Sequence, residues 1–175
     1  MRKLIILSAP LALLAAPAMA QTAVDGTVDI NGSVAGRCMF IVPNKTISLG
    51  EISLASNGKL DVSKVNGRSE TLTGWCNNTT AAMTVTATQL TNATTAPTGF
   101  DNRVDYTATA VTGSTSANDS SVTAGAGSAS SVGLFSGDIV VTLSNASTPN
   151  NGLMVAGTYN GNVVVTLTPT VTVGG

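Results

Sequence analysis

Apolar and polar residues alternate without interruption over residues 24–34, which read VDGTVDINGSV. Every even-numbered position is Val, Ile or Gly, and the odd-numbered positions between them carry Asp, Thr, Asn or Ser. Successive side chains of a strand point to opposite faces, so this period of two predicts a strand with one dry face and one polar face. Whatever fold the chain adopts has to account for that dry face.

The first twenty residues have the pattern of an export signal. The charged residues Arg2 and Lys3 precede an apolar run over residues 4–16, and Ala18-Met19-Ala20 forms an A-x-A cleavage pattern. We therefore expect residues 1–20 to be a signal peptide, and we expect an exported, soluble protein that begins at Gln21.

The composition of the remaining chain favours a single all-β domain. About 155 residues are enough for one core. Without Arg2 and Lys3, six basic and nine acidic side chains remain, a formal charge near −3 that disfavours a nucleic-acid partner. Thr, Ser, Ala, Val, Gly and Asn dominate, and this mixture suits extended chain better than helix.

Further short strands are predicted at intervals of about ten residues, which is typical of a β-sandwich. Residues 60–65 alternate weakly and are expected to form an edge strand. Residues 112–131 consist almost entirely of Gly, Ser, Ala, Thr and Asn, so we expect a mobile surface loop that buries little apolar area. The other predicted strands are residues 37–42, 46–49, 70–76, 81–90, 104–110, 132–135, 138–143 and 157–167.

The two cysteines, Cys38 and Cys76, predict one disulfide with Trp75 beside it. An exported chain folds in an oxidising compartment, and closing a loop of about 40 residues would stabilise the fold by roughly 4 kcal/mol. Metal binding is the alternative, although two thiolates without histidine make a poor site.

No residue pattern predicts a catalytic, cofactor-binding or metal-binding site. The chain contains no histidine, so the usual base of a Ser or Cys nucleophile is missing. The carboxylates are spread along the chain, and we expect them to be solvated surface groups.

Residues 25–38, DGTVDINGSVAGRC, resemble the amino-terminal region of chaperone-usher pilins, the major fimbrial subunits of the type 1 kind. In that family a Gly-Thr-Val-x-Phe-x-Gly-x-Val pattern leads into the first cysteine, and Ile30 stands at the aromatic position here. The second cysteine and the stretch AGTYNGNVVVTL, residues 156–167, are similar to the disulfide spacing and the last strand of such subunits. These subunits commonly end with a penultimate aromatic residue, whereas this chain ends with Gly174-Gly175.

The resemblance implies that residues 37–175 form an immunoglobulin-like β-sandwich that lacks its final strand. Residues 21–36 would be an N-terminal extension that completes a neighbouring subunit as a donor strand, with Gly36-Arg37 as its hinge. The implied partners are a periplasmic chaperone, an outer-membrane usher, further copies of the chain and a host or surface receptor. The product would be an adhesive fimbrium, or pilus, on a Gram-negative cell.

In this role the dry face of the extension would fill successive pockets about 6.7 Å apart. Its Val and Ile side chains would contribute a gross of about 6–12 kcal/mol before ordering costs. The donor positions are Val24, Gly26, Val28, Ile30, Gly32 and Val34, and the last strand would line the groove with Tyr159, Gly161, Val163, Val165 and Leu167.

Two other interpretations stay open at the level of sequence. Residues 24–34 could pair within their own chain as an ordinary first strand, giving a self-complete secreted sandwich that serves as a coat or as a carbohydrate- or receptor-binding module. An enzyme that uses a perturbed carboxylate is the third hypothesis.

Overall fold

The computed structural model describes residues 21–170. The predicted signal peptide at residues 1–20 and the chain end at residues 171–175 lie outside the described residues. The chain divides into two units, residues 1–33 and residues 34–175. In the first unit, residues 21–33 contain no strand and no helix.

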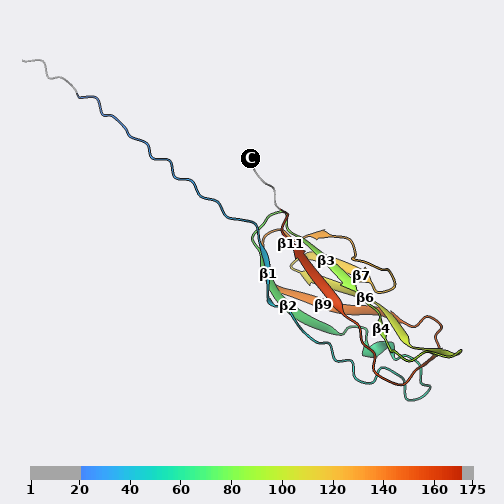
Figure 1. Cartoon of the computed structure of the whole chain (residues 1–175). Coiled ribbons are helices and arrows are strands. Elements are labelled where there is room, and N and C mark those ends of the chain that lie inside the picture. Colours follow the sequence, from blue (N-terminus) through green and yellow to red (C-terminus); the bar gives the residue numbers. More distant parts are fainter. Residues whose placement is uncertain (1–20, 171–175) are drawn as a thin grey trace, which may run out of the picture. The chain divides into compact units, whose positions relative to one another are not determined.

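Residues 34–170 form an all-β domain, which confirms the predicted fold class at this level. The described residues include one short 3-10 helix, η1 (Val62–Lys64), and no α-helix. The strands are β1 (Cys38–Val42), β2 (Ser69–Cys76), β3 (Ala82–Ala87), β4 (Leu90–Thr91), β5 (Phe100–Asp101), β6 (Arg103–Thr112), β7 (Thr115–Ser120), β8 (Ser130–Ser131), β9 (Phe135–Ser147), β10 (Leu153–Met154) and β11 (Val163–Thr168) (Figure 1).

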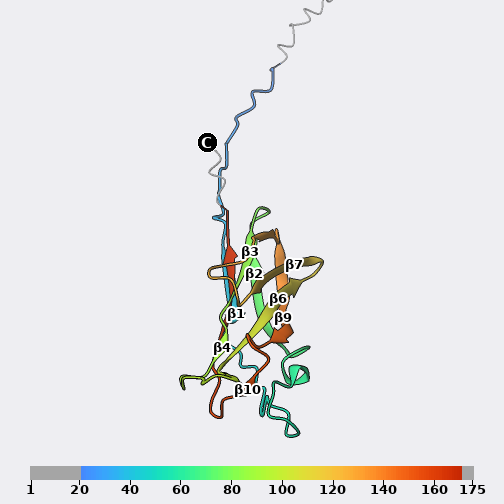
Figure 2. The same ribbon diagram turned by 90° about the vertical axis from the view of Figure 1, so that its right-hand side faces the viewer.

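In the described part of the chain, most of these strands belong to two antiparallel sheets. The larger sheet has the order β1-β2-β9-β6-β4, with β7 also paired to β6, and the smaller has the order β11-β3-β8. A short parallel pair joins β5 to β10. Both views in Figures 1 and 2 show β11 running alongside β3. Strands β1 and β11 are edge strands, because each pairs with one neighbour only.

A single hydrophobic core is shared by the two sheets. Met83, Val85 and Val165 reach it from the smaller sheet, and Ile139 and Val141 reach it from the larger one. Alternate side chains of a strand share a face, so the period-two pattern correctly identified the buried positions of the central strands. Those confirmed positions are Met83, Val85, Ala87, Val104, Tyr106, Ala108 and Ala110.

Cys38 and Cys76 form the predicted disulfide. They are directly opposite each other in the β1–β2 ladder, with their Cα atoms 4.1 Å apart. Met39 pairs with Trp75 in the next position, so Trp75 lies beside the disulfide as predicted. Because both thiols are used, the alternative of a metal site at these cysteines is wrong.

The prediction of a mobile loop at residues 112–131 is wrong for β7 and β8, which occupy part of this stretch, while residues 121–129 contain no strand. Strand β7 pairs with β6 along its whole length. The buried Asp119 carboxylate accepts a hydrogen bond from the Ala87 backbone N–H at 2.8 Å, and the buried Ser121 hydroxyl accepts one from the Tyr106 N–H at 2.9 Å. Hydrogen bonds to buried polar side chains therefore hold this segment to the domain, whereas the burial of apolar side chains holds the other strands.

The predicted edge strand at residues 60–65 is also wrong. Leu60 makes only an isolated bridge with Ser53, and the following residues turn into η1. Asp61 caps this helix, since its carboxylate accepts a hydrogen bond from the Ser63 N–H at 3.1 Å. A capping aspartate favours a helical turn over an extended chain at this point. The strand predicted at residues 138–143 lies inside the longer β9, whereas the one predicted at residues 132–135 is wrong except for Phe135, where β9 begins.

Candidate functional site: an open groove between two edge strands

A groove of about 510 Å³ opens between the edge strands of the two sheets. One wall is Phe40 of β1 with the chain that follows it, residues 43–49, and the other wall is residues 161–165 at the start of β11. The floor consists of side chains that belong to the core, namely Leu72, Leu90, Tyr106, Val141 and Leu143. The core of the domain is thus partly uncovered along this side.

The wall at residues 43–49 belongs to no sheet. Ile47 and Leu49 are half-buried against the core, while Thr46 and Ser48 between them are exposed. The alternation that predicted a strand at residues 46–49 is present, but the paired strand is not. The segment has no partner strand among the described residues.

The opposite wall, β11, presents a free backbone edge. The Asn162 carbonyl accepts a hydrogen bond from the Thr88 N–H at 2.9 Å. Antiparallel ladders alternate bonded and non-bonded pairs, so the even-numbered residues of β11 bond to β3. The N–H and C=O groups of Val163, Val165 and Leu167 therefore point the other way, toward a side on which no described strand pairs.

Three of the five groove positions predicted on the last strand line the groove. Gly161, Val163 and Val165 do so, and Val165 is also buried in the core. Leu167 packs against the core beyond the groove lining.

Tyr159 is not a groove residue, and the predicted beginning of the last strand at residue 157 is too early. Strand β11 starts only at Val163. The Tyr159 hydroxyl instead donates to the Val155 carbonyl at 2.9 Å, with the Asp101 carbonyl at 3.1 Å. Tyr159 thus fastens the loop that precedes β11.

The sequence reasoning also missed most of the floor and one wall. These residues are Phe40, Ile47, Leu49, Leu72 and Leu90, which share a half-buried position next to the core. Except for Leu90, which is out of phase with Met83, Val85 and Ala87, these residues lie at the inward positions of an alternating stretch, and that was a usable signal. Alternation within each segment does not show whether two such segments pair with each other.

Tyr106 crosses the floor of the groove with its hydroxyl already bonded. This hydroxyl donates to the Thr88 carbonyl at 2.7 Å, with the Asn162 carbonyl at 3.2 Å. Burial, and after it the negative charge of Asp119, raises the pKa of Tyr106 to about 12. The floor therefore stays uncharged at neutral pH, and charged side chains line the groove only at Lys45 and Glu70.

The predicted donor residues belong to no strand or bridge of their own chain. Val24, Val28, Ile30 and Val34 are between 85% and 92% exposed. A Cβ added at either donor glycine, Gly26 or Gly32, would meet no atom within 4 Å. The structure does not pair residues 24–34 as a first strand of their own sheet, and their role as a donor strand stays a prediction.

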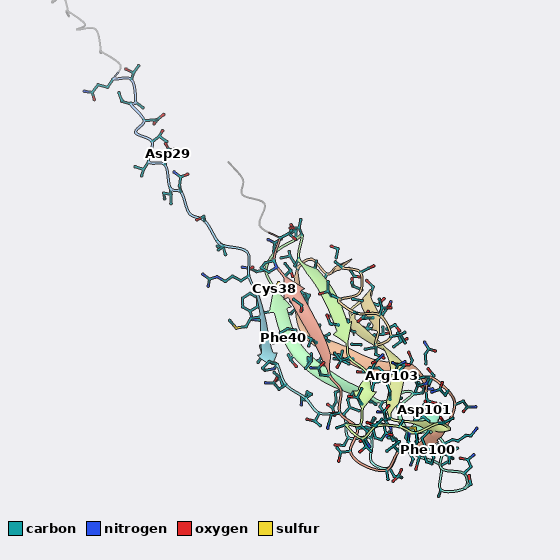
Figure 3. The ribbon with its side chains drawn as sticks, turned by 45° about the vertical axis from the view of Figure 1, so that its right-hand side comes forward. Asp29, Cys38, Phe40, Phe100, Asp101 and Arg103 are labelled. Carbon is teal, nitrogen blue, oxygen red and sulfur yellow. A yellow bond between two sulfur atoms is a disulfide. The ribbon has the colours of Figure 1, made fainter. Side chains whose placement is uncertain are left out.

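A polar cluster at the other end of the domain from the disulfide is held together by its own hydrogen bonds (Figure 3). The buried Asp101 carboxylate accepts bonds from the Gly152 N–H at 2.7 Å and the Asn150 side-chain amide at 2.9 Å. Burial alone would raise the pKa of Asp101, but these hydrogen bonds lower it below its usual value. Nearby, Arg103 forms an ion pair with the buried Asp105 at 3.3 Å. The expectation of solvated carboxylates is wrong at these sites.

Within residues 21–170, no group of three His, Cys, Asp or Glu side chains is placed to hold a metal ion. No helix in the same range is long and apolar enough to cross a membrane. Searches against protein-family models, characterised proteins and solved structures found no match to this chain. The open groove and the exposed alternating segment are therefore the features from which a function can be argued.

Proposed function

We propose that this protein is a structural subunit of a chaperone-usher type surface filament, and that copies join when residues 22–34 of one copy enter the groove of the next. The observation that carries the proposal is the free backbone edge of β11 beside an uncovered stretch of core. An added strand would supply both the missing hydrogen bonds and the missing apolar cover. Left open, such an edge is an aggregation hazard.

The apolar positions of residues 22–34 match what the groove lacks. Val24, Val28, Ile30 and Val34 lie on one face of the predicted strand and would cover the floor of the groove, including Leu72, beside the Val163 wall. Each such side chain stabilises the joint by about 1.5–3 kcal/mol when it is fully buried. The opposite face carries Asp25 and Asp29, whose charge is complementary to that of the exposed Lys45 on the groove wall.

The ends of the domain favour one direction of insertion. The chain enters β1 through Ala35, which bonds to Asn77, and the chain that follows β11 reaches Thr170, which bonds to the neighbouring Asn78. A donated strand parallel to β11 would bring the donor's domain to this same end, where the acceptor's own extension leaves. An antiparallel strand brings the donor's domain to the far end and leaves that extension free for a third copy.

Repeated antiparallel insertion of this kind does not close on itself, so it builds an open, polar filament. The proposal includes an immunoglobulin-like sandwich that lacks one strand, a chaperone that covers the groove before assembly, and an usher at the outer membrane. A self-complete coat or binding module is less favoured, because the β11 edge and residues 43–49 lack a partner strand among the described residues.

The test is assembly of the full chain carrying Val28→Asp, which would force a charge into a dry pocket. The matched control is Thr27→Asp, which adds the same charge to the polar face of the same segment. Electron microscopy and sedimentation should show filaments for the wild type and for Thr27→Asp, and monomers for Val28→Asp. Filaments formed equally well by Val28→Asp, or a wild type that stays monomeric, would contradict the proposal.

A further inference from the structure

The turn between β2 and β3, residues 77–80 with the sequence NNTT, holds the point at which the extension enters the domain. The Asn77 side chain accepts a hydrogen bond from the Arg37 N–H and donates one to the Ala35 carbonyl at 3.1 Å. The Asn77 backbone N–H donates to the Arg37 carbonyl at 3.0 Å. The hinge predicted at Gly36-Arg37 is therefore wrong, because both neighbours of Gly36 are tied to Asn77.

The same NNTT turn also holds the chain just after β11, beyond the groove wall. The Asn78 side-chain amide donates to the Thr170 carbonyl at 2.7 Å, and the Thr80 hydroxyl lies 3.0 Å from that carbonyl. The Thr170 hydroxyl in turn donates to the Thr80 carbonyl. The chain that follows β11 is thus fixed just beyond the free edge.

Gly36, whose two neighbours are tied to Asn77, also lies against the Asn78 side chain. A Cβ at Gly36 would lie 2.5 Å from the Asn78 side-chain nitrogen, so only glycine allows this approach. Asn78 has little freedom to move away, because its side-chain oxygen also accepts a hydrogen bond from the Thr80 N–H at 2.8 Å. One short turn therefore joins the base of the extension to the end of β11.

Building on the proposed function, we infer that the NNTT turn is a positioning element for polymerisation, in which Asn77 acts on the strand that a copy donates and Asn78 acts on the groove that it offers. With residues 35–37 held on Asn77, the donated strand ends at Val34 and the joint contains no free linker. Without that hold, these residues must lose their conformational freedom when the strand inserts. Without Asn78, the chain after β11 keeps only its bonds to Thr80, so the end of the free edge is held less firmly.

Asparagine-to-aspartate substitutions separate these two contacts with little change of shape. Asn77→Asp keeps the oxygen that accepts from Arg37 and loses the bond to Ala35, and Asn78→Asp keeps the oxygen that accepts from Thr80 and loses the bond to Thr170. The matched control is Asn57→Asp, an exposed site whose side-chain oxygen accepts from the Lys59 N–H in the same way.

Two measurements on the full chain distinguish the roles. The first is the growth rate of filaments. The second is binding of a fluorescent peptide with the sequence of residues 22–34 to chains that also carry Val28→Asp, which keeps them from donating. Asn77→Asp should slow growth about tenfold and leave peptide binding unchanged. Asn78→Asp should weaken peptide binding about tenfold and slow growth as well, and Asn57→Asp should change neither.

A merely structural role of the turn would instead lower the melting temperature of both variants and make Asn77→Asp lose peptide binding as well as growth, so thermal unfolding is recorded for every variant. The inference is overturned if Asn77→Asp grows like the Asn57→Asp control or loses peptide binding as far as Asn78→Asp does, or if Asn78→Asp binds the peptide as well as Asn57→Asp does. If the wild type forms no filaments and the Val28→Asp chain binds no peptide, the proposed function itself fails.

Discussion

One edge of the smaller sheet is closed by hydrogen bonds from its own chain, and the other edge is open. On the β3 side, residues of the polar 112–131 stretch close the edge, because Gly127 donates to the Val85 carbonyl at 2.8 Å and Asp119 accepts from Ala87 at 2.8 Å. On the β11 side, no described strand pairs with the backbone, and apolar core residues line an open groove.

This difference between the two edges is the opposite of what the amino-acid composition of their segments suggests. The stretch that is poor in apolar residues is folded into the domain, and the apolar, regularly alternating residues 24–34 and 46–49 are unpaired. At the closed edge Gly127 is required, since a Cβ there would lie 2.0 Å from the Asn118 carbonyl oxygen. Whether a segment pairs within the domain therefore depends on the partners it meets as well as on its own hydrophobicity. We expect substitutions at the closed edge to cost stability and those at the open edge to cost binding of the next copy.

The disulfide should have the largest effect, because it ties β1, one wall of the groove, to β2. Replacing Cys38 and Cys76 together with serine should lower the free energy of unfolding by about 4 kcal/mol. Urea denaturation monitored by Trp75 fluorescence measures this change. An equally stable variant would show that β1 is held in place without the disulfide.

At the closed edge, Asp119→Ala should lower the free energy of unfolding by about 1.5–3 kcal/mol, because it leaves the buried Ala87 N–H without an acceptor. The control is Asp138→Ala, an exposed site on the larger sheet whose carboxylate accepts from Thr73. That change should stay within about 0.5 kcal/mol. An effect of Asp119→Ala no larger than that of Asp138→Ala would show that the Asp119 bond does not stabilise the closed edge.

Tyr106→Phe tests the floor of the groove. It should lower the free energy of unfolding at neutral pH by about 1 kcal/mol. The pKa of Tyr106 is raised to about 12, whereas an unfolded tyrosine loses its proton near pH 10. Stability from the buried phenol is therefore complete below pH 10 and is lost as the pH rises to about 12. Thermal unfolding between pH 9 and 12 should show a flatter decline for the variant. An unchanged slope would mean that other groups govern the alkaline transition.

The smallest effect is expected at the rim of the groove. Lys45→Glu should slow association of the 22–34 peptide by about two- to fivefold, mainly at low salt, because it replaces attraction to Asp25 and Asp29 with repulsion. Lys59→Glu, outside the groove lining, is the control. Stopped-flow fluorescence at two salt concentrations measures the association rate of the peptide for both variants. Equal rates would exclude electrostatic steering of the peptide by Lys45.

The period-two pattern succeeded where strands are paired within the domain. It located β3 and β6 and their buried residues because burial on one face leaves a direct trace in the sequence. The same trace at residues 46–49 could not say whether a neighbouring strand exists. The burial of Asp119 could not be predicted from this pattern, because its partner, the Ala87 N–H, lies 32 residues away in the chain. Tyr159 was misplaced because the pattern does not mark where β11 begins.

The sequence by itself determined an all-β chain, a disulfide and the faces that its strands turn to the core, because period, composition and cysteine count are local properties. Only the tertiary structure decided which edge is closed, which is open, and that one asparagine-rich turn holds both ends of the domain. Those features depend on hydrogen bonds between residues far apart in the chain, and local alternation carries no record of them.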